Sequence, residues 1–247
     1  MPAFTIITAT FNASQHLPAL VASLRAQTFK DFEWVVADGN STDGTLDILA
    51  DVKDLNLIVS SQPDFGIYDA LNRAIKLTTS NYYVVIGADD VFRPEAINNF
   101  VTAFKSGADL ATAPILINGK PNQLSPLPVY IIGYKAKLYG HSAGTAFKKS
   151  LHDKYGFYTK KYPIAADYDF MVKVILGNEK IAYINTPSAD FGMSGVSNTD
   201  KLGCFTEVLR INVSHHSGLP LQILIFLLRT VKYYLFDKCL RFFSRLK

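Results

Sequence analysis

The sequence has few cysteines, little charge and no long apolar run. Its 247 residues include only Cys204 and Cys239, which form no CxxC pair and belong to no Cys/His cluster. A disulfide framework and a zinc site are therefore not indicated, and a reducing compartment is the simpler interpretation. No stretch of about twenty apolar residues occurs, so a conventional membrane span is not expected. The chain begins MPAFTIITATFN, without the basic segment of a secretory signal, which predicts a cytosolic protein.

The small net charge is unevenly distributed along the chain. Lys and Arg number 25 against 21 Asp and Glu, and this excess of +4 gives no reason to expect a nucleic-acid partner. Residues 219–247 carry six basic residues and one acid, whereas residues 1–218 carry 19 basic and 20 acidic residues. The basic excess therefore belongs to the C-terminal tail. Because 49% of the residues are hydrophobic, the chain can bury a real core, and disorder is excluded as its main state.

The hydrophobic pattern predicts an α/β fold with a mainly parallel sheet, because short β-branched runs alternate with longer amphipathic ones. In the first half we expect strands at residues 4–10, 32–38, 55–62 and 82–89, and helices at 14–27, 42–50, 67–78 and 94–105. The second half is less regular, with strands expected at 108–117 and 181–187 and a helix at 166–176. No linker divides the halves. We therefore expect one catalytic domain, residues 1–218 with halves 1–105 and 106–218, followed by a tail, residues 219–247.

Acids or amides follow each of the first four predicted strands. Ligands of open α/β sheets bind beyond the carboxyl ends of the strands, so these side chains are expected at one binding edge. The residues at the strand ends are Thr10, Phe11 and Asn12 after the first, Asp38 after the second, Asp64 after the third, and Asp89 and Asp90 after the fourth.

Clustered carboxylates are costly unless a cation lies among them, because like charges raise one another's pKa. Mg²⁺ or Mn²⁺ prefers one or two carboxylates together with phosphate oxygens and water, a partial shell that Asp89 and Asp90 supply. The alternative for Asp90 is a cap on the helix opened by Pro94. We assign capping of the helix after the second strand to residues 41–43, which leaves Asp38 free to accept a hydrogen bond from a nucleobase. Phe11 offers a stacking face, although such an aromatic more often belongs to a core.

Three segments carry a family resemblance. They read TIITATFNASQHLPALVASLRAQTFKDFEWVVADGNSTDGT, SQPDFGIYDALNRAI and YYVVIGADDVF, and they resemble the family 2 glycosyltransferases of the GT-A fold. The likeness is strong over residues 1–105 and continues more weakly through HSAGTAFKKSL and AADYDFMVKV to about residue 197. The sequence is most similar to bacterial members that build exopolysaccharide or O-antigen repeat units.

The resemblance implies a role for each residue at the strand ends. Phe11 and Asp38 would hold the uracil or other base of a nucleotide-sugar, with Thr10 and Asn12 beside them. Asp64 and Arg73 would lie near its ribose and phosphates. The pair Asp89–Asp90 stands at the DXD position, where Asp90 would ligate Mg²⁺ or Mn²⁺ directly and Asp89 would contact the metal or the nucleotide-sugar. Two positions depart from the family pattern, since Gly87 replaces the first acid of the motif and Ala9 a frequent proline.

In the second half, ADYDF resembles the family's ED motif, whose second acid deprotonates the acceptor hydroxyl. That acid is Asp167, and Ala166 replaces the usual glutamate. The alternative role of Asp167 is an N-cap for the following helix. The resemblance implies an inverting transferase that moves a sugar from a UDP-sugar or related donor in one displacement. The acceptor would be a hydroxyl of a glycan, carried on a lipid, in bacterial surface polysaccharide synthesis.

Residues 140–144 read GHSAG, which matches the G-x-S-x-G nucleophile elbow of serine hydrolases. A hydrolase acting through Ser142 is therefore the serious alternative. The run before Ser142 is too charged for a buried strand, no HGGG-like segment lies upstream, and a hydrolase gives no reason for acids at four strand ends. On the transferase interpretation, residues 141–144 begin a strand beneath the acceptor and His141 approaches the diphosphate or metal. A dehydrogenase is disfavoured, because no G-x-G-x-x-G follows the first strand.

The tail combines a long apolar run with basic residues. This composition predicts an interfacial helix whose Lys and Arg side chains reach anionic headgroups, which would place the enzyme on the inner face of the cytoplasmic membrane. The alternative is that residues 219–236 pack on the domain or on a second subunit in a homo-oligomer. Residues 191–202, rich in Gly and Ser, resemble GGxS segments of the family, which implies a flexible lid or acceptor loop. The alternative is a plain turn at residues 197–200. We assign no role to Glu207.

Overall fold

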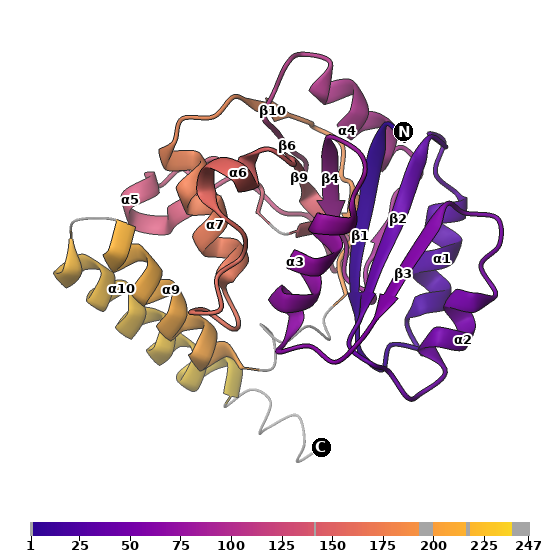
Figure 1. The fold of residues 1–247 in the computed structure, drawn as a ribbon. Coiled ribbons are helices and arrows are strands. Elements are labelled where there is room, and N and C mark those ends of the chain that lie inside the picture. Colours follow the sequence, from indigo (N-terminus) through magenta and orange to yellow (C-terminus); the bar gives the residue numbers. More distant parts are fainter. Residues whose placement is uncertain (1, 141, 193–199, 216–217, 239–247) are drawn as a thin grey trace.

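The computed structural model describes residues 2–140, 142–192, 200–215 and 218–238, with side-chain surroundings as far as residue 235. Its centre is a seven-stranded sheet with helices on both faces (Figure 1). The order of its strands is β10 (Ile181–Tyr183), β6 (Leu110–Thr112), β9 (Thr145–Lys148), β4 (Tyr82–Val85), β1 (Phe4–Thr10), β2 (Phe32–Asp38) and β3 (Leu57–Ser61). β9 is antiparallel to both its neighbours and the other pairs are parallel, which confirms the predicted α/β fold with a mainly parallel sheet.

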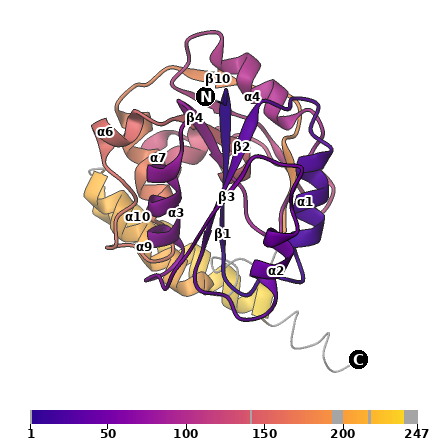
Figure 2. The ribbon, with the colours of Figure 1, turned by 45° about the vertical axis from the view of Figure 1, so that its right-hand side comes forward.

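A second, smaller sheet and the helices complete the fold. The smaller sheet has the order β5 (Val91–Phe92), β11 (Ala189–Asp190), β7 (Ile115–Ile117) and β8 (Lys120–Pro121). On one face of the large sheet lie α1 (Leu17–Arg25), α2 (Thr45–Ala50) and α4 (Ala96–Phe104) (Figure 2). On the other lie α3 (Ile67–Leu77), α6 (Leu151–Tyr155), α7 (Ala166–Leu176) and α9 (Lys201–His215). Two more helices, α5 (Val129–Ile132) and α10 (Leu219–Lys232), flank this second layer (Figure 1).

The strands are buried on both faces, as expected of a parallel sheet covered by two helical layers. Successive side chains of a strand point to opposite faces, so they join different cores. Ile6 and Trp34 pack with α1 and α4, whereas Ile7 and Val35 pack with α3 and α7. This alternation fixes the register of β1 against β2 and with it the positions of the side chains that follow both strands.

Four predicted strands were too long. Two of them, 55–62 and 181–187, shorten to Leu57–Ser61 and Ile181–Tyr183. The run expected as one strand over residues 108–117 is divided between the two sheets, because Pro114 has no N–H for a ladder and its carbonyl instead accepts a hydrogen bond from Ser188 N at 2.8 Å. The strand expected over residues 82–89 ends at Val85, and the chain then turns through Gly87 so that Asp90 N donates to Gly87 O.

The helix of the predicted tail is fastened to the domain. α10 lies alongside α9 in both views (Figures 1 and 2). Asn212 of α9 donates from Nδ2 to Gln222 Oε1 at 3.0 Å, and Gln222 donates from Nε2 to Tyr130 O at 2.7 Å. Asn212 Oδ1 also accepts the Tyr168 hydroxyl of α7 at 2.8 Å. Within the described part of the chain, none of the helices has both the length and the apolarity that crossing a membrane requires.

Glu33 ties the amino-terminal end of the large sheet together. Its buried carboxylate accepts hydrogen bonds from Thr5 Oγ1 at 2.6 Å, Thr79 N at 2.7 Å and Thr79 Oγ1 at 2.8 Å. Burial alone would raise the pKa of Glu33, but the hydrogen bonds from Thr5, Thr79 and Ser80 outweigh it and hold the pKa below its usual value. The charged form is therefore the one that stabilises the fold.

We expect Glu33→Gln to lower the free energy of unfolding by about 1–3 kcal/mol, because charge-assisted hydrogen bonds to buried donors are lost. Since the folded-state pKa is depressed, the stabilisation is full above the unfolded pKa of about 4.3 and is lost as the pH falls below it. Urea unfolding between pH 7 and pH 3 measures both effects. Asp31→Asn, an exposed neighbour, is the matched control. Equal acid sensitivity of Glu33→Gln and the wild type would contradict the assignment.

Candidate functional site

The ends of β1 and β2 meet at one edge of the sheet. Thr10 and Asp38 are register partners, and Thr10 Oγ1 donates to Asp38 Oδ1 at 2.9 Å. Asn12 has a left-handed backbone with φ of 49°. Its Oδ1 accepts from Thr42 N at 2.9 Å, and its own N–H donates to Ser41 Oγ at 2.8 Å. Thr10 and Asn12 therefore hold the loop after β2 against the end of β1.

The carboxylate of Asp38 already accepts hydrogen bonds from the protein, contrary to the expectation that it is free to accept one from a nucleobase. It is fully buried, and its two oxygens accept from Thr10 Oγ1 at 2.9 Å, Ser41 Oγ at 2.5 Å, Ser41 N at 2.9 Å and Ser61 Oγ at 2.8 Å. Burial alone would raise the pKa of Asp38, but these hydrogen bonds outweigh it and keep the pKa below its usual value. A carboxylate has about four acceptor positions, so a nucleobase could bind Asp38 only by displacing a present donor. The prediction missed this because the donors lie on three separate segments.

The capping role expected for residues 41–43 is also corrected. The residue before α2 is Gly44, in a left-handed conformation with φ of 89° and with no side-chain cap. Asp43 instead accepts from Thr45 N at 3.1 Å, Thr45 Oγ1 at 2.6 Å and Ser14 N at 3.0 Å. These contacts fix the loop across β1 and β2.

Phe11, Gly39 and Asp64 lie together beside this loop. Phe11 is 69% exposed, so its ring is available for stacking and does not belong to the core. A Cβ atom at Gly39 would lie 2.8 Å from Asp64 Oδ2 and 3.3 Å from Phe11 Cδ2. Only glycine allows the ring and the carboxylate to approach the strand end this closely. The structure thus brings together two of the predicted nucleotide-binding residues.

Arg73 lies beneath the end of β2, on α3. Its Nη2 donates to Asp38 O at 2.8 Å and more weakly to Ser60 O at 3.4 Å. Its Nε and Nη1 are buried and make no hydrogen bond to the described residues. Two buried guanidinium donors without a protein acceptor are costly, and a bound anion would satisfy them.

Asp89 and Asp90 converge on Gly87. A Cβ atom at Gly87 would lie 2.9 Å from Asp89 Oδ1 and 2.9 Å from Asp90 Oδ2. Asp90 is almost fully buried and accepts from Gly192 N at 2.7 Å and Gly87 N at 3.1 Å. Asp90 does not cap the next helix, which begins at Ala96 after Glu95, so that alternative is wrong. Glycine at position 87 therefore leaves room for both carboxylates to approach the turn.

The pair Asp89–Asp90 suits a divalent cation. Burial raises the pKa of Asp90 to about 6, and the negative charge of Asp89 adds to the rise. A cation between the two carboxylates would offset both costs. The described residues contain no group of three or more His, Cys, Asp and Glu side chains that could enclose a metal. Such a cation would therefore need phosphate oxygens or water for the rest of its shell, as Mg²⁺ and Mn²⁺ commonly do.

Asp167 belongs to a second cluster, in the first turn of α7. Its Oδ1 accepts from the Tyr68 hydroxyl at 2.6 Å and from Tyr168 N at 2.8 Å. The N-cap position belongs to Ala165, which has no side-chain cap, so the capping alternative for Asp167 is wrong. Burial, and then the charge of Asp167, raise the pKa of Tyr68 well above its usual value, so Tyr68 remains a protonated donor.

The sequence did not predict Tyr68 as part of this cluster, and it gave Glu207 no role. Tyr68 gave no signal of its own in the sequence, although it stands in the SQPDFGIYDALNR segment. Glu207 of α9 holds the entry to α7, because its Oε2 accepts from Ile164 N at 2.9 Å and Ala165 N at 2.8 Å. The partners of each are about forty or more positions away in the chain, so local patterns could not reveal them.

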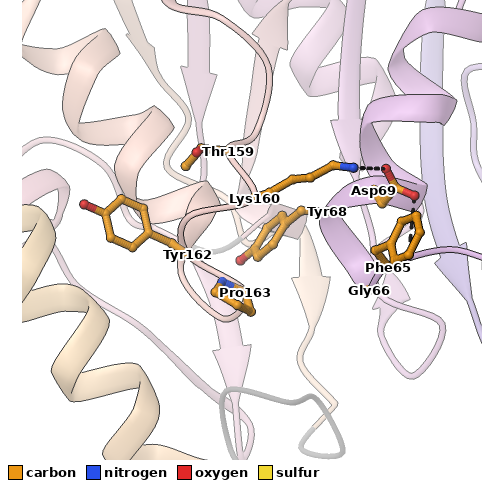
Figure 3. A pocket seen from close by; sticks show the side chains of 8 residues that line it. All are labelled: Phe65, Gly66, Tyr68, Asp69, Thr159, Lys160, Tyr162 and Pro163. Carbon is orange, nitrogen blue, oxygen red and sulfur yellow. Dashed lines mark hydrogen bonds and ion pairs between the residues drawn. The ribbon is translucent and has the colours of Figure 1, made fainter.

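A pocket of about 350 Å³ lies between the amino-terminal end of α3 and the segment that leads into α7 (Figure 3). Phe65 and Asp69 line one side, Lys160 and Tyr162 the other, and Tyr68 stands between them. Tyr68 therefore belongs both to this pocket and to the cluster around Asp167.

The serine hydrolase alternative is overturned. A nucleophile elbow follows a strand and opens a helix. Ser142 instead opens a 3₁₀ turn (Ser142–Gly144) that leads into the antiparallel strand β9. The strand expected to begin at residues 141–144 begins at Thr145. His141, and residues 193–199 of the predicted lid or turn, lie outside the described residues.

Comparison with known proteins gives the same family as the resemblance noted above. Residues 5–159 match the family described as Glycosyl transferase family 2. A PGL/p-HBAD biosynthesis glycosyltransferase of Mycobacterium bovis is 30% identical over 207 residues, which cover 80% of this chain and 80% of the relative. An uncharacterized glycosyltransferase of Mycobacterium tuberculosis is 26% identical over 223 residues, covering 87% of this chain and 84% of that protein.

Solved glycosyltransferase structures share the fold. Residues 1–349 of S. aureus TarS in complex with UDP have a TM-score of 0.68 at 20% identity, and the match covers 96% of this chain and 73% of that TarS chain. The mannosyltransferase PcManGT of Pyrobaculum calidifontis, in complex with GDP-Man and Mn²⁺, has a TM-score of 0.68 at 17% identity, covering 96% and 71%. With the sheet edge, the acidic pair and the family match in agreement, the chain belongs to glycosyl transferase family 2 and is a glycosyltransferase of the GT-A fold.

Proposed function

We propose that the chain transfers a sugar from a nucleotide-sugar, a UDP-sugar in this proposal, to a hydroxyl of a glycan acceptor with inversion at the anomeric carbon. The observation that carries the proposal is the separation of the acids into two sets. Asp89 and Asp90 lie at the end of β4, suited to a cation and a diphosphate, whereas Asp167 is held on α7 by Tyr68. One set would serve the leaving group and the other the attacking hydroxyl.

The chemistry follows from this division of roles. Asp167 accepts the proton of the acceptor hydroxyl as its oxygen attacks the anomeric carbon from the face opposite the diphosphate. The Tyr68 hydroxyl orients the Asp167 carboxylate, and Glu207 fixes the backbone on which Asp167 stands. A single displacement inverts the configuration and needs no carboxylate nucleophile.

On the donor side, Phe11 would stack on the base, and Asp64 and Arg73 would contact the ribose and phosphates. Asp38, in this proposal, orders the base-binding loop through Thr10 and Ser41. The residues Asp89 and Asp90 would hold Mg²⁺ or Mn²⁺, with Asp90 as the direct ligand. When bound, the ion would stabilise the negative charge that develops on the departing diphosphate. Mn²⁺ is present with UDP and phosphoglyceric acid in the related glucosyl-3-phosphoglycerate synthase of Mycobacterium tuberculosis, which supports this assignment by analogy.

A lipid-linked acceptor at the inner face of the cytoplasmic membrane, in bacterial surface polysaccharide synthesis, is the proposed context. The outward face of α10 is apolar, with Leu224, Leu227 and Leu228 each more than half exposed. Arg229 is half-buried and stands seven residues, close to two turns, after the buried Gln222, so it faces the protein. The outward leucines support our proposal that residues 219–247 are a membrane-associating tail after a catalytic domain of residues 1–218. Arg229 faces the protein, so it departs from the expectation that the basic residues of the tail reach headgroups.

A panel of nucleotide sugars tests the proposed activity. The full chain is incubated with Mg²⁺ or Mn²⁺, each UDP- or GDP-sugar, and lipid extract as the source of acceptor. We expect one donor to be consumed with release of its nucleoside diphosphate and EDTA to abolish consumption. Activity unchanged by EDTA would contradict the metal assignment, and consumption of no donor would contradict the proposed reaction.

We expect the double substitution Leu224→Gln, Leu228→Gln to reduce binding to phosphatidylglycerol-containing vesicles at least tenfold. Each outward leucine would lose a burial of about 1.5–3 kcal/mol in the lipid. Vesicle sedimentation measures the partition coefficient. Leu127→Gln with Leu176→Gln, two leucines exposed elsewhere, is the matched control. Wild-type protein that stays in the supernatant would contradict the membrane proposal. Dimerisation through this face in analytical ultracentrifugation would show that a second copy covers α10.

A further inference from the structure

The turn after β3 separates two compartments at the binding edge. Asp64 points to one side, where its Oδ2 would lie 2.8 Å from a Cβ atom at Gly39, close to Phe11. The next residue, Phe65, lines the pocket on the other side, together with Tyr68 and Lys160 (Figure 3). The nucleotide is assigned to the Asp64 side. The Phe65 side therefore has space for a different ligand.

Phe65 is held out in solvent on a fixed turn. Its side chain is 89% exposed, the largest exposed fraction among the described large apolar side chains. Gly66 N donates to Asp64 Oδ1 at 3.0 Å and Asp69 N donates to Gly66 O at 3.0 Å, so the backbone on both sides of the ring is anchored. The long contact from Phe65 N to Asp69 Oδ2 at 3.4 Å closes the turn. An anchored aromatic ring with an open face is a preorganised stacking surface.

The charges of the pocket are balanced. Lys160 Nζ lies 3.8 Å from Asp69 Oδ1 and 5.0 Å from the centre of the Phe65 ring. A phosphate or carboxylate in the pocket would have to compete with Asp69, so the pair favours an uncharged ligand with hydrogen-bonding groups. Three aromatic side chains, those of Phe65, Tyr68 and Tyr162, line the same space. Aromatic surface combined with a few polar groups suits a ring that has both an apolar face and hydroxyl groups.

The volume and position of the pocket limit the size of the ligand and the place where it would bind. About 350 Å³ is at the small end of ligand sites, which suits one ring and its substituents but not an extended chain. Tyr68, whose hydroxyl donates to Asp167, lines the pocket. A ring bound against Phe65 would therefore stand next to the proposed base, on the side away from the nucleotide.

We propose that this pocket binds an uncharged pyranose ring of the acceptor, with Phe65 as its stacking surface and the pair Lys160–Asp69 as its hydrogen-bonding partners. The inference rests on the proposed function for the identity of the acceptor side. To that function it adds the chemical class of the acceptor ring and the residues that would recognise this ring. Phe65 and Lys160 are then specificity-determining residues for the acceptor.

Saturation-transfer NMR on the full chain tests this inference, with UDP and diamagnetic Mg²⁺ present to fill the nucleotide side. The probes are methyl pyranosides of the common hexoses, N-acetylhexosamines and deoxyhexoses. We expect at least one pyranoside to bind and its Kd to rise at least fivefold in Phe65→Ala. Phe65→Trp, which keeps a stacking face, is expected to restore the Kd to within twofold of the wild type. Because Phe65 is exposed, neither substitution removes core packing, and circular dichroism checks the fold.

The matched control is Tyr183→Ala, an aromatic that is 49% exposed on β10 at the opposite edge of the sheet, and it should leave the Kd unchanged. Absence of pyranoside binding, or equal binding by Phe65→Ala, would overturn the inference. Displacement of the pyranoside by equimolar inorganic phosphate or cyclohexanol would also overturn it, in favour of an anionic or a purely apolar ligand. Titration with UDP and GDP separates the two proposals. If a nucleotide binds and no pyranoside does, only this inference fails; if neither nucleotide binds, the proposed function fails.

Discussion

Asp167→Asn is expected to lower kcat about 10²–10⁴-fold, the range contributed by a positioned general base. The amide keeps the size of the side chain and can still accept hydrogen bonds from Tyr68 and Tyr168 N, but it cannot take the proton of the acceptor hydroxyl. The fold, the KM for the donor and the affinity for the nucleotide should change little. Transfer assays at saturating donor and acceptor measure kcat, and calorimetry with UDP measures the affinity.

Asp153→Asn is the matched control for Asp167→Asn, because Asp153 is an exposed acid on the neighbouring helix α6. It should leave kcat within twofold of the wild type. If Asp167→Asn retains more than a tenth of the wild-type kcat, Asp167 is not the base. If instead it loses nucleotide affinity and thermal stability together, its role is structural.

Asp90→Asn is expected to lower kcat/KM about 10²–10³-fold, the typical loss when one group that stabilises transition-state charge is removed. Asparagine keeps one oxygen for the Gly192 N–H, but its amide nitrogen cannot accept from Gly87 N and the buried negative charge is gone. Affinity for Mn²⁺ in the presence of UDP should fall at least tenfold, because the direct carboxylate ligand of the proposal is lost. Calorimetric titration with Mn²⁺ and steady-state kinetics test the two effects separately.

Asp51→Asn, at the exposed end of α2, removes the same charge away from the site and should change neither quantity. Gly87→Ala adds an independent arm, since its new Cβ atom would press on both Asp89 and Asp90 at 2.9 Å. We expect it to weaken Mn²⁺ binding as well. Unchanged Mn²⁺ affinity in Asp90→Asn would contradict the metal site.

Much of the fold could be predicted from local patterns. β1 and β2 were located correctly to the residue, because continuous β-branched runs end at polar residues in both segments. The predicted helices were correct in type and order. The four of the first half begin later or end earlier than expected, whereas the helix over residues 166–176 was located to the residue. The strand over residues 108–117 was overextended, because the effect of Pro114 depends on the strand that pairs beside it.

The candidate site was predictable only in part. The positions of Asp38, Asp64 and Asp90 at one edge follow from the strand ends, but the state of each carboxylate does not. Asp38 is saturated by donors from three segments, and Asp90 is buried against Gly192, which lies 102 residues along the chain. Burial and hydrogen-bond partners of this kind depend on contacts between distant parts of the chain.

By itself, the sequence determined the α/β class, the mainly parallel sheet and the delivery of acids to its carboxyl-terminal edge, because side-chain periodicity and strand ends are local properties. It also fixed the charge difference between the body and the tail. Only the tertiary structure decided that Asp38 is saturated, that α10 turns leucines outward and Arg229 inward, and that Phe65 and Asp64 face different compartments. The reason is physical. Burial, the saturation of a carboxylate and the space beside a ring depend on which distant residues surround a side chain, and the packing of helices against the sheet settles that.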